Sequence, residues 1–172
     1  MNINYLLSII FIALAMIYFL FEPMKIKKLN SKEVPLFSLG IFTLYELDTL
    51  GLSTLMKGSS ATRYSDRYIV KDIDYTDNSN EFRANMQSKN GLYKEDIVYL
   101  DGDVYFTRAD GLRYFSQKAV YNKSTDTVHS EVDYVANMNE NIVYGDYIKY
   151  DNMSKKMTSN NVYAIYKIKE KK

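Results

Sequence analysis

The longest β-like run in the sequence, Gly91 to Gly111, constrains the fold more than any other stretch. Bulky and β-branched residues fill it, and such residues suit a pleated, half-buried surface. Turn-forming pairs stand at both ends, Asn90-Gly91 and Asp110-Gly111. In the middle, Asp101-Gly102 permits two interpretations: a two-residue hairpin loop, or a bulge inside one long strand. Both predict that this run is the centre of a sheet.

Alternation of apolar and polar residues predicts one-faced antiparallel strands in other segments as well. It is clear in residues 82–86, 127–135 and 162–168. Beyond Pro35 the chain has no proline and no segment with a helical period, so we predict an all-β domain. Similar residues recur 35 positions apart, as at Ala84 and Ala119. This repetition predicts an elongated, open sheet with free edges at both ends.

The N-terminal segment is different in character. Asn2 to Phe21 carries no charge, and twenty helical residues span about 30 Å, the thickness of a bilayer core. A cleaved signal peptide is the alternative, but the basic n-region and the small-residue cleavage site are missing. We therefore predict an uncleaved single transmembrane helix at residues 1–22, a linker at 23–35 and a β domain at 36–172. Four lysines follow the apolar run, and the positive-inside rule would place them in the cytoplasm.

Composition argues against several classes of function. The formal net charge is +1, with 22 basic and 21 acidic residues, whereas a nucleic-acid binder would show a basic excess. The chain has no cysteine and one histidine, which excludes zinc sites of Cys and His. His129 reads as a surface residue beside Glu131 and Asp133. No phosphate loop or hydrolase motif is present, so we predict no enzyme activity, no cofactor and no metal.

Several short motifs stand in a specific order behind the predicted anchor. They are Gly51-Leu52-Ser53, Ala61 to Asp66, Phe82 to Ala84, Val98 to Val104, Asp110-Gly111, Ala119 to Tyr121 and Tyr144-Gly145. In this order and spacing the chain resembles the lipopolysaccharide transport protein C (LptC) family. The resemblance implies an elongated, antiparallel, twisted β-jelly-roll of the LptA/LptC/OstA-like type, with the segment around Gly102 as one continuous strand.

The same resemblance implies a function and a location. LptC-like proteins are single-pass proteins of the Gram-negative inner membrane with the β domain in the periplasm. They receive lipopolysaccharide from an ABC transporter and pass it to the soluble relative LptA. This topology puts the amino terminus in the cytoplasm, in conflict with the lysines that follow the apolar run.

A carrier of acyl chains needs an apolar trough, because a chain of about twelve methylenes costs roughly 10 kcal/mol to hold in water. The alternative is that the same residues form the closed core of a membrane-tethered structural or adhesive domain; a tethered hydrolase is a third reading. Five arginines, at 63, 67, 83, 108 and 113, could meet lipid phosphates or be ordinary solvated charges. The predicted lipid-binding residues are Phe82, Ala84, Met86, Ile97, Tyr99, Val104, Phe106, Phe115, Val128, Val132 and Tyr134.

The last strand-like segment, Lys155 to Ile168, is predicted to be a free edge. Such an edge carries a row of unpaired N–H and C=O groups. Pairing with an edge strand of LptA would extend both sheets by β-augmentation. The predicted partner-binding residues are Gly145, Val162, Tyr163, Ala164, Ile165 and Tyr166.

Overall fold

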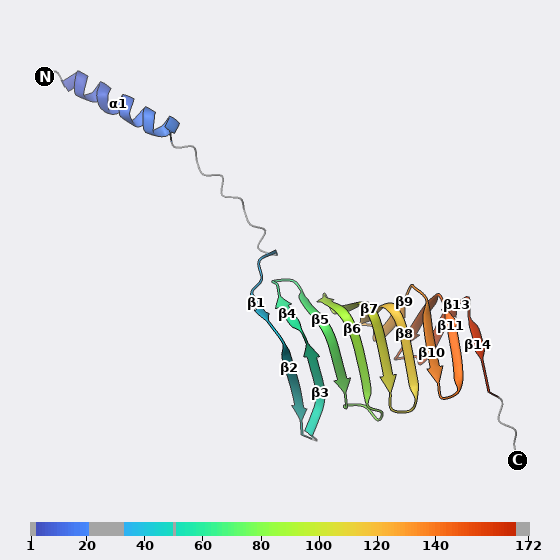
Figure 1. Cartoon of the computed structure of the whole chain (residues 1–172). Coiled ribbons are helices and arrows are strands. Elements are labelled where there is room, and N and C mark those ends of the chain that lie inside the picture. Colours follow the sequence, from blue (N-terminus) through green and yellow to red (C-terminus); the bar gives the residue numbers. More distant parts are fainter. Residues whose placement is uncertain (1–2, 21–32, 50, 168–172) are drawn as a thin grey trace, which may run out of the picture. The chain divides into compact units, whose positions relative to one another are not determined.

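The computed structural model of the protein describes residues 3–20, 33–49 and 51–167. The chain divides into two compact units, Met1–Ser31 and Lys32–Lys172 (Figure 1). The first unit contains the helix α1, Ile3–Leu20. No helix among the described residues is both long and apolar enough to cross a bilayer. The predicted transmembrane anchor at residues 1–22 is therefore without support from the described residues.

The described part of the second unit is a single antiparallel sheet of 14 strands. This confirms the prediction of an all-β fold. The strands are β1 (Phe37–Leu39), β2 (Phe42–Asp48), β3 (Gly51–Gly58), β4 (Ser60–Arg63), β5 (Tyr68–Asp77), β6 (Ala84–Lys94), β7 (Ile97–Arg108), β8 (Leu112–Asn122), β9 (Thr127–Ser130), β10 (Tyr134–Met138), β11 (Asn141–Gly145), β12 (Tyr147–Asp151), β13 (Lys156–Asn160) and β14 (Tyr163–Ile165).

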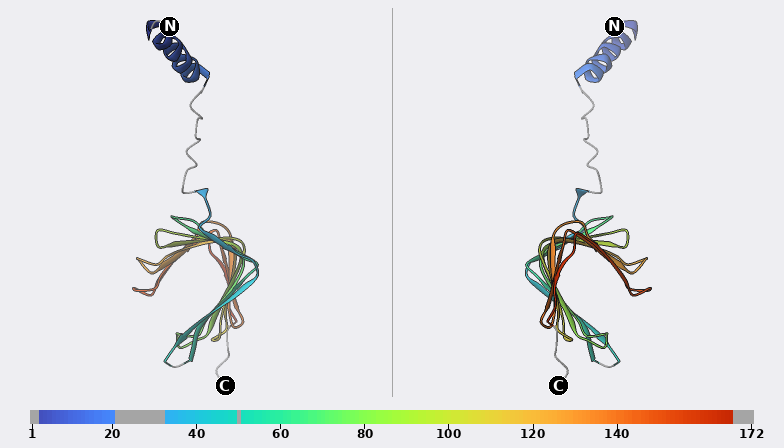
Figure 2. Two further views of the ribbon diagram at one scale, coloured as in Figure 1. Left: turned by 90° about the vertical axis from the view of Figure 1, so that its left-hand side faces the viewer. Right: turned by 90° about the vertical axis from the view of Figure 1, so that its right-hand side faces the viewer.

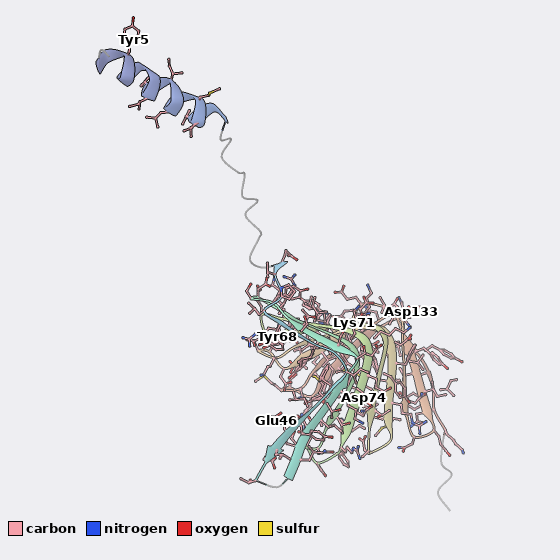
Figure 3. All side chains as sticks on the ribbon, turned by 60° about the vertical axis from the view of Figure 1, so that its left-hand side comes forward. Tyr5, Glu46, Tyr68, Lys71, Asp74 and Asp133 are labelled. Carbon is pink, nitrogen blue, oxygen red and sulfur yellow. The ribbon has the colours of Figure 1, made fainter. Side chains whose placement is uncertain are left out.

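The four long strands β5 to β8 bend sharply near their middle, which folds the sheet into two arms (Figure 2). We call the bend the crease; it lies at Lys71-Asp72, Lys89-Asn90, Asp101 to Asp103 and Gln117-Lys118. Arm A holds β1, β4, β9, β12, β13 and the adjoining halves of the long strands. Arm B holds β2, β3, β10, β11, β14 and the other halves. In Figure 3, Tyr68 and Asp74 mark the two arms along β5, with Lys71 between them.

The central run is one strand with a bulge, as the resemblance implied, and the hairpin alternative is wrong. β7 continues from Ile97 to Arg108, and its pairing with both neighbours shifts register around Gly102. Gly102 has φ +84° and its neighbour Asp103 has φ 48°. Glycine adopts such left-handed angles at little cost. On β6, the Ser88 hydroxyl lies 3.0 Å from the Asn90 carbonyl and 3.3 Å from that of Gly102, which satisfies backbone acceptors at the bend.

The buried core lies against the crease. Ile73 and Val104 from arm B pack against Leu100 and Ala119 from arm A, and we call the face that carries them the inner face. Gly91 makes this close packing possible, because a Cβ there would lie 2.3 Å from Cδ1 of Ile73. Hydrophobic burial across the bend therefore holds the two arms together.

Three predictions about the strands need correction. The turn predicted at Asn90-Gly91 lies inside β6, where Gly91 packs against Ile73, and the hairpin between β6 and β7 turns at Glu95-Asp96 instead, with φ 52° and 62°. Residues 127–135 are not one strand: β9 ends at Ser130 in arm A, and β10 begins at Tyr134 in arm B. The hydroxyls of Ser116 and Ser130, both buried, lie 3.0 Å apart where the chain changes arms. Lys155 to Ile168 likewise divides into β13 and β14, with Asn161 at φ 46° between them, and Ile168 lies outside the described residues.

The 35-residue repeat is also not the structural one. β6 and β8 occupy equivalent places on either side of β7, and they match at a shorter offset. Ser88 corresponds to Ser116, and Tyr93 corresponds to Tyr121. Which residues occupy equivalent places in β6 and β8 depends on their pairing with β7. The 35-residue period was inferred from similar residue types, and these do not follow that pairing.

Replacing Leu100 by alanine should lower the free energy of unfolding by about 2–4 kcal/mol, because it opens a cavity in the buried cluster at the crease. The matched control is Tyr99→Ala, one residue away on the opposite, outer face, where the ring is 41% exposed. We expect that variant to cost less than about 1 kcal/mol. Urea denaturation followed by circular dichroism measures both; equal losses would contradict the assignment of the two faces.

Candidate functional site

Two rows of paired residues follow the inner face from one end of the sheet to the other. We call the row on arm B row B. Each member is the direct cross-strand partner of the next, and every one is apolar or aromatic. Row B consists of Leu44, Met56, Tyr75, Met86, Phe106, Tyr114, Ala136, Val143 and Ala164. At about 4.8 Å between strands the row is roughly 40 Å long.

Row A is its counterpart on arm A and is rich in tyrosine. It consists of Phe37, Arg63, Tyr68, Tyr93, Val98, Tyr121, Val128, Tyr150 and Met157. One charge interrupts it near the N-terminal end, where the Arg63 guanidinium carbon lies 5.2 Å from the centre of the Tyr68 ring. The remainder of row A is apolar or aromatic.

The two rows are not buried. Residues beside the crease are sealed, with Val104 only 2% exposed, whereas every member of rows A and B is half-buried or exposed. Tyr68 and Val128, for example, both retain 38% exposure. A closed sandwich would bury residues on facing inner surfaces. The inner face therefore presents a long apolar surface that the domain does not cover with its own side chains.

Hydroxyls of row A are held at the ends of the hairpins. Tyr93 donates to Asp96 at 2.9 Å, and Tyr121 donates to Asp126 at 3.1 Å. The hydrogen bond to Asp96, followed by burial, raises the pKa of Tyr93; burial, followed by the bond to Asp126, raises the pKa of Tyr121. With the polar ends fixed at the rim, the ring faces remain available for apolar contact.

At the C-terminal end a tyrosine connects the arms. Tyr134 on β10 is 3% exposed, and its hydroxyl lies 2.7 Å from the Ser159 hydroxyl on β13. Ser159 in turn donates to the Tyr147 carbonyl at 2.7 Å. The Tyr134 ring also stacks on Tyr114, with centroids 5.7 Å apart. Tyr134 itself lies one inner-face position closer to the crease than Ala136 of row B, so it bridges the arms and covers only the Tyr114 part of that row.

The predicted lipid-binding residues distribute unevenly over this surface. Met86 and Phe106 lie in row B and Val128 in row A; Ala84, Val104 and Tyr134 share the inner face. Ile97, Tyr99 and Phe115 lie on the outer face instead. Phe82 and Val132 lie outside any strand, in the segments before β6 and β10.

Sequence reasoning missed most of the aromatic members of the two rows. They are Phe37, Tyr68, Tyr75, Tyr93, Tyr114, Tyr121 and Tyr150. A local signal existed for two of them, because Tyr93 and Tyr121 each precede an aspartate at a hairpin end. For the others, only the cross-strand register reveals the face.

Each arm ends in a strand with one free side, as far as the described residues extend. At the C-terminal end these strands are β14 in arm B and β13 in arm A; at the N-terminal end they are β2 and β1. Tyr163, Ala164 and Ile165 form β14. Val162 and Tyr166 flank it and are exposed. Gly145 is not on this edge: it pairs with Tyr134 on β10.

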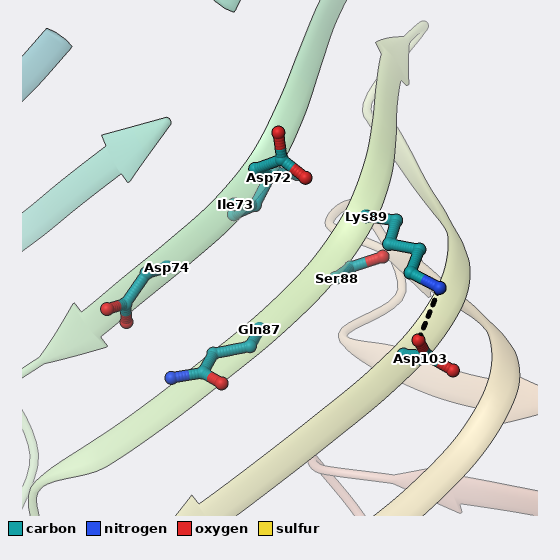
Figure 4. Close-up of a pocket in the computed structure, with 7 residues that line it drawn as sticks. All are labelled: Asp72, Ile73, Asp74, Gln87, Ser88, Lys89 and Asp103. Carbon is teal, nitrogen blue, oxygen red and sulfur yellow. Dashed lines mark ion pairs between the residues drawn. The ribbon is translucent and has the colours of Figure 1, made fainter. Parts of the chain in front are cut away.

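A pocket with an ionic lining lies at the crease (Figure 4). It has a volume of about 370 Å³ and includes Asp72, Asp74, Lys89 and Asp103 in its lining. Lys89 and Asp103 form an ion pair at 2.6 Å. Their hydrogen bond raises the pKa of Lys89 and lowers that of Asp103. Among the described residues no cluster of histidine and carboxylates has the arrangement of a metal site.

Comparison with known proteins gives a single line of similarity, through the fold. No protein-family model matches the chain, and no curated protein matches it. Among solved structures, the chain is similar to the crystal structure of LptH from Pseudomonas aeruginosa, described as the LptA-homologous periplasmic component of the lipopolysaccharide transport device. The TM-score is 0.52 at 12% sequence identity, over 80% of this chain and 99% of that one. At this identity the likeness shows a shared fold.

Proposed function

We propose that this protein is a non-enzymatic lipid-transfer component of the LptC type. In this role it receives lipopolysaccharide from an inner-membrane ABC transporter, covers the acyl chains along rows A and B, and passes the lipid to an LptA protein. The observation that carries the proposal is the pair of apolar rows left uncovered on the inner face. The similarity in fold to a periplasmic component of a lipopolysaccharide transport device supports the same role.

The energetics favour a lipid ligand for this surface. An acyl chain of about twelve methylenes gains roughly 10 kcal/mol when it leaves water for an apolar surface. Rows of roughly 40 Å offer such a surface along the whole sheet. The competing function, a structural domain with a closed core, fits less well because its inner residues would be sealed as Val104 is.

The proposal includes attachment to the inner membrane, with the β domain in the periplasm. Its support is the charge-free sequence from Asn2 to Phe21. Lysines at 25, 27, 28 and 32 oppose this orientation under the positive-inside rule. A reporter fused to the C-terminus measures the topology: alkaline phosphatase should be active there and a cytoplasmic reporter inactive.

Photocrosslinking tests lipid binding directly. A photoreactive side chain at Val98 in row A or at Phe106 in row B should capture lipopolysaccharide from purified full-length protein, because both positions face the open inner surface. The control is Tyr99, adjacent to Val98 on the outer face of the same arm. Capture at Tyr99 equal to that at Val98 would contradict the proposed binding surface.

A further inference from the structure

A second apolar surface lies on the outer face of arm B. We call it the outer strip; it consists of Tyr105, Phe115, Val135, Tyr144 and Tyr163, each the direct partner of the next. Four of these side chains are exposed, and Tyr163 reaches 64%. The rings of Tyr144 and Tyr163 lie 6.1 Å apart. A contiguous exposed apolar strip of this kind marks an interaction site.

A neighbouring row extends the surface toward the hairpin ends. Ile142 and Ile165 are paired there, and Ile165 is exposed. The same row contains Arg113, and Arg83 lies just before β6 in a pocket with Asn85 and Thr107. Among the described residues neither arginine has an ion-pair partner. Two unneutralised guanidinium groups therefore lie along this flank.

The opposite flank is acidic. Asp133 and Asp146 stand at the crease ends of β10 and β11, next to Tyr134 and Gly145. The outer strip is thus aromatic in the middle, cationic toward the hairpin ends and acidic toward the crease. This arrangement suits a partner that has an anionic surface over an apolar interior. The cationic flank would contact the anionic surface, and the aromatic residues would contact the apolar interior.

We propose that the outer strip docks on the surface of a lipid bilayer that contains anionic lipids. Tyrosine favours the membrane interface, because its ring is apolar and its hydroxyl reaches water. Arginines beside the rings attract anionic headgroups. Residues 21–35 can reach at most about 50 Å, so a domain attached through the N-terminal segment stays near the bilayer. Only this last point depends on the proposed membrane attachment.

Such docking gives the domain a fixed side toward the membrane. Arm B would lie on the bilayer through its outer face, and rows A and B would face away from the headgroups between the arms. The inner surface would then remain free while its carrier stays beside the membrane. Rows A and B and the outer strip have similar residue types, but under this proposal they bind different things: the rows bind the carried lipid and the strip binds the bilayer.

Fluorescence quenching tests the docking, and the absence of cysteine from the chain permits single-site labels. Full-length Tyr105→Cys and Tyr99→Cys, each with an environment-sensitive fluorophore, are mixed with vesicles of phosphatidylcholine with or without phosphatidylglycerol. A fraction of the lipid carries a nitroxide quencher in its acyl chain. The two positions are matched, since both are outer-face tyrosines of β7 with 36% and 41% exposure.

We expect quenching at position 105, stronger with phosphatidylglycerol and weaker at high salt, and little quenching at 99. Arg83→Gln and Arg113→Gln should each weaken the anionic-lipid dependence about fivefold. Equal quenching at 105 and 99, or none at 105, would overturn the proposal. If the fluorescence at position 105 changes with protein concentration and not with the amount of lipid, the proposal is wrong and the strip contacts a second copy of the chain. No lipopolysaccharide is present, so failure here leaves the proposed carrier function untouched.

Discussion

Phe106→Glu should reduce the affinity for lipopolysaccharide by about 100-fold or more. The residue lies in the middle of row B, between Met86 and Tyr114, where an acyl chain would contact it. A carboxylate there must either stay hydrated, which keeps the chain away, or lose water without a partner, which costs several kcal/mol. The nearest cation on the inner face of β7 is Arg108, which already binds Asp110 through two hydrogen bonds of 2.9 and 2.8 Å.

The binding assay uses full-length protein and fluorescent lipopolysaccharide, with circular dichroism and thermal unfolding as checks on the fold. Tyr99→Glu is the matched control, because it adds the same charge to the same strand on the outer face of the other arm. We expect near-normal binding for that variant. Equal losses from Phe106→Glu and Tyr99→Glu, or unchanged binding by a folded Phe106→Glu variant, would contradict the location of the acyl chains along row B.

Ala164→Pro should weaken docking to a soluble LptA protein by about 10- to 100-fold. β14 is a terminal strand whose one described neighbour is β11, so its other side can accept a partner strand. In an antiparallel ladder, alternate N–H groups point to opposite sides of the strand. Proline removes one donor and leaves the partner carbonyl unsatisfied, which accounts for the expected loss.

Ile165→Pro is the matched variant, because its N–H points to the other side of the same strand. We expect a smaller effect on docking and a larger effect on the pairing with β11. Pull-down of LptA measures the first effect and hydrogen exchange in β11 the second. If both folded variants bind as well as the parent, the handover uses another edge, and the exposed N-terminal strand β2 is the next to test.

The location of the strands was readable from the sequence because strand formation depends on local pattern. Turn residues at Asp110-Gly111 correctly marked the hairpin between β7 and β8, whereas the turn predicted at Asn90-Gly91 lies inside β6, which continues to Lys94. Within the described part of the chain β14 pairs with β11 alone, which agrees with the edge predicted at the C-terminal end. The failures occurred where one apparent segment serves both arms, as in residues 127–135, because the change of arm is stabilised by contacts such as Ser116 with Ser130 that are distant in sequence.

The inner face could not be assigned from alternation alone, and Tyr99 illustrates why. In β5, β6 and β8, two successive residues at the crease are both exposed on the outer face. As a result, inner-face residues have even numbers in one arm and odd numbers in the other along β5, and the same change occurs in β6 and β8 in the corresponding way. The extra residue at Gly102 removes this change in β7, so Leu100 and Val104 share the inner face while Tyr99 lies outside. The sequence by itself therefore determined an all-β domain, the approximate place of many strands, and Gly102 as the site of either a hairpin or a bulge. Only the tertiary structure decided which face each half-strand buries, because the packing of Ile73, Leu100, Val104 and Ala119 across the crease sets the register on both sides.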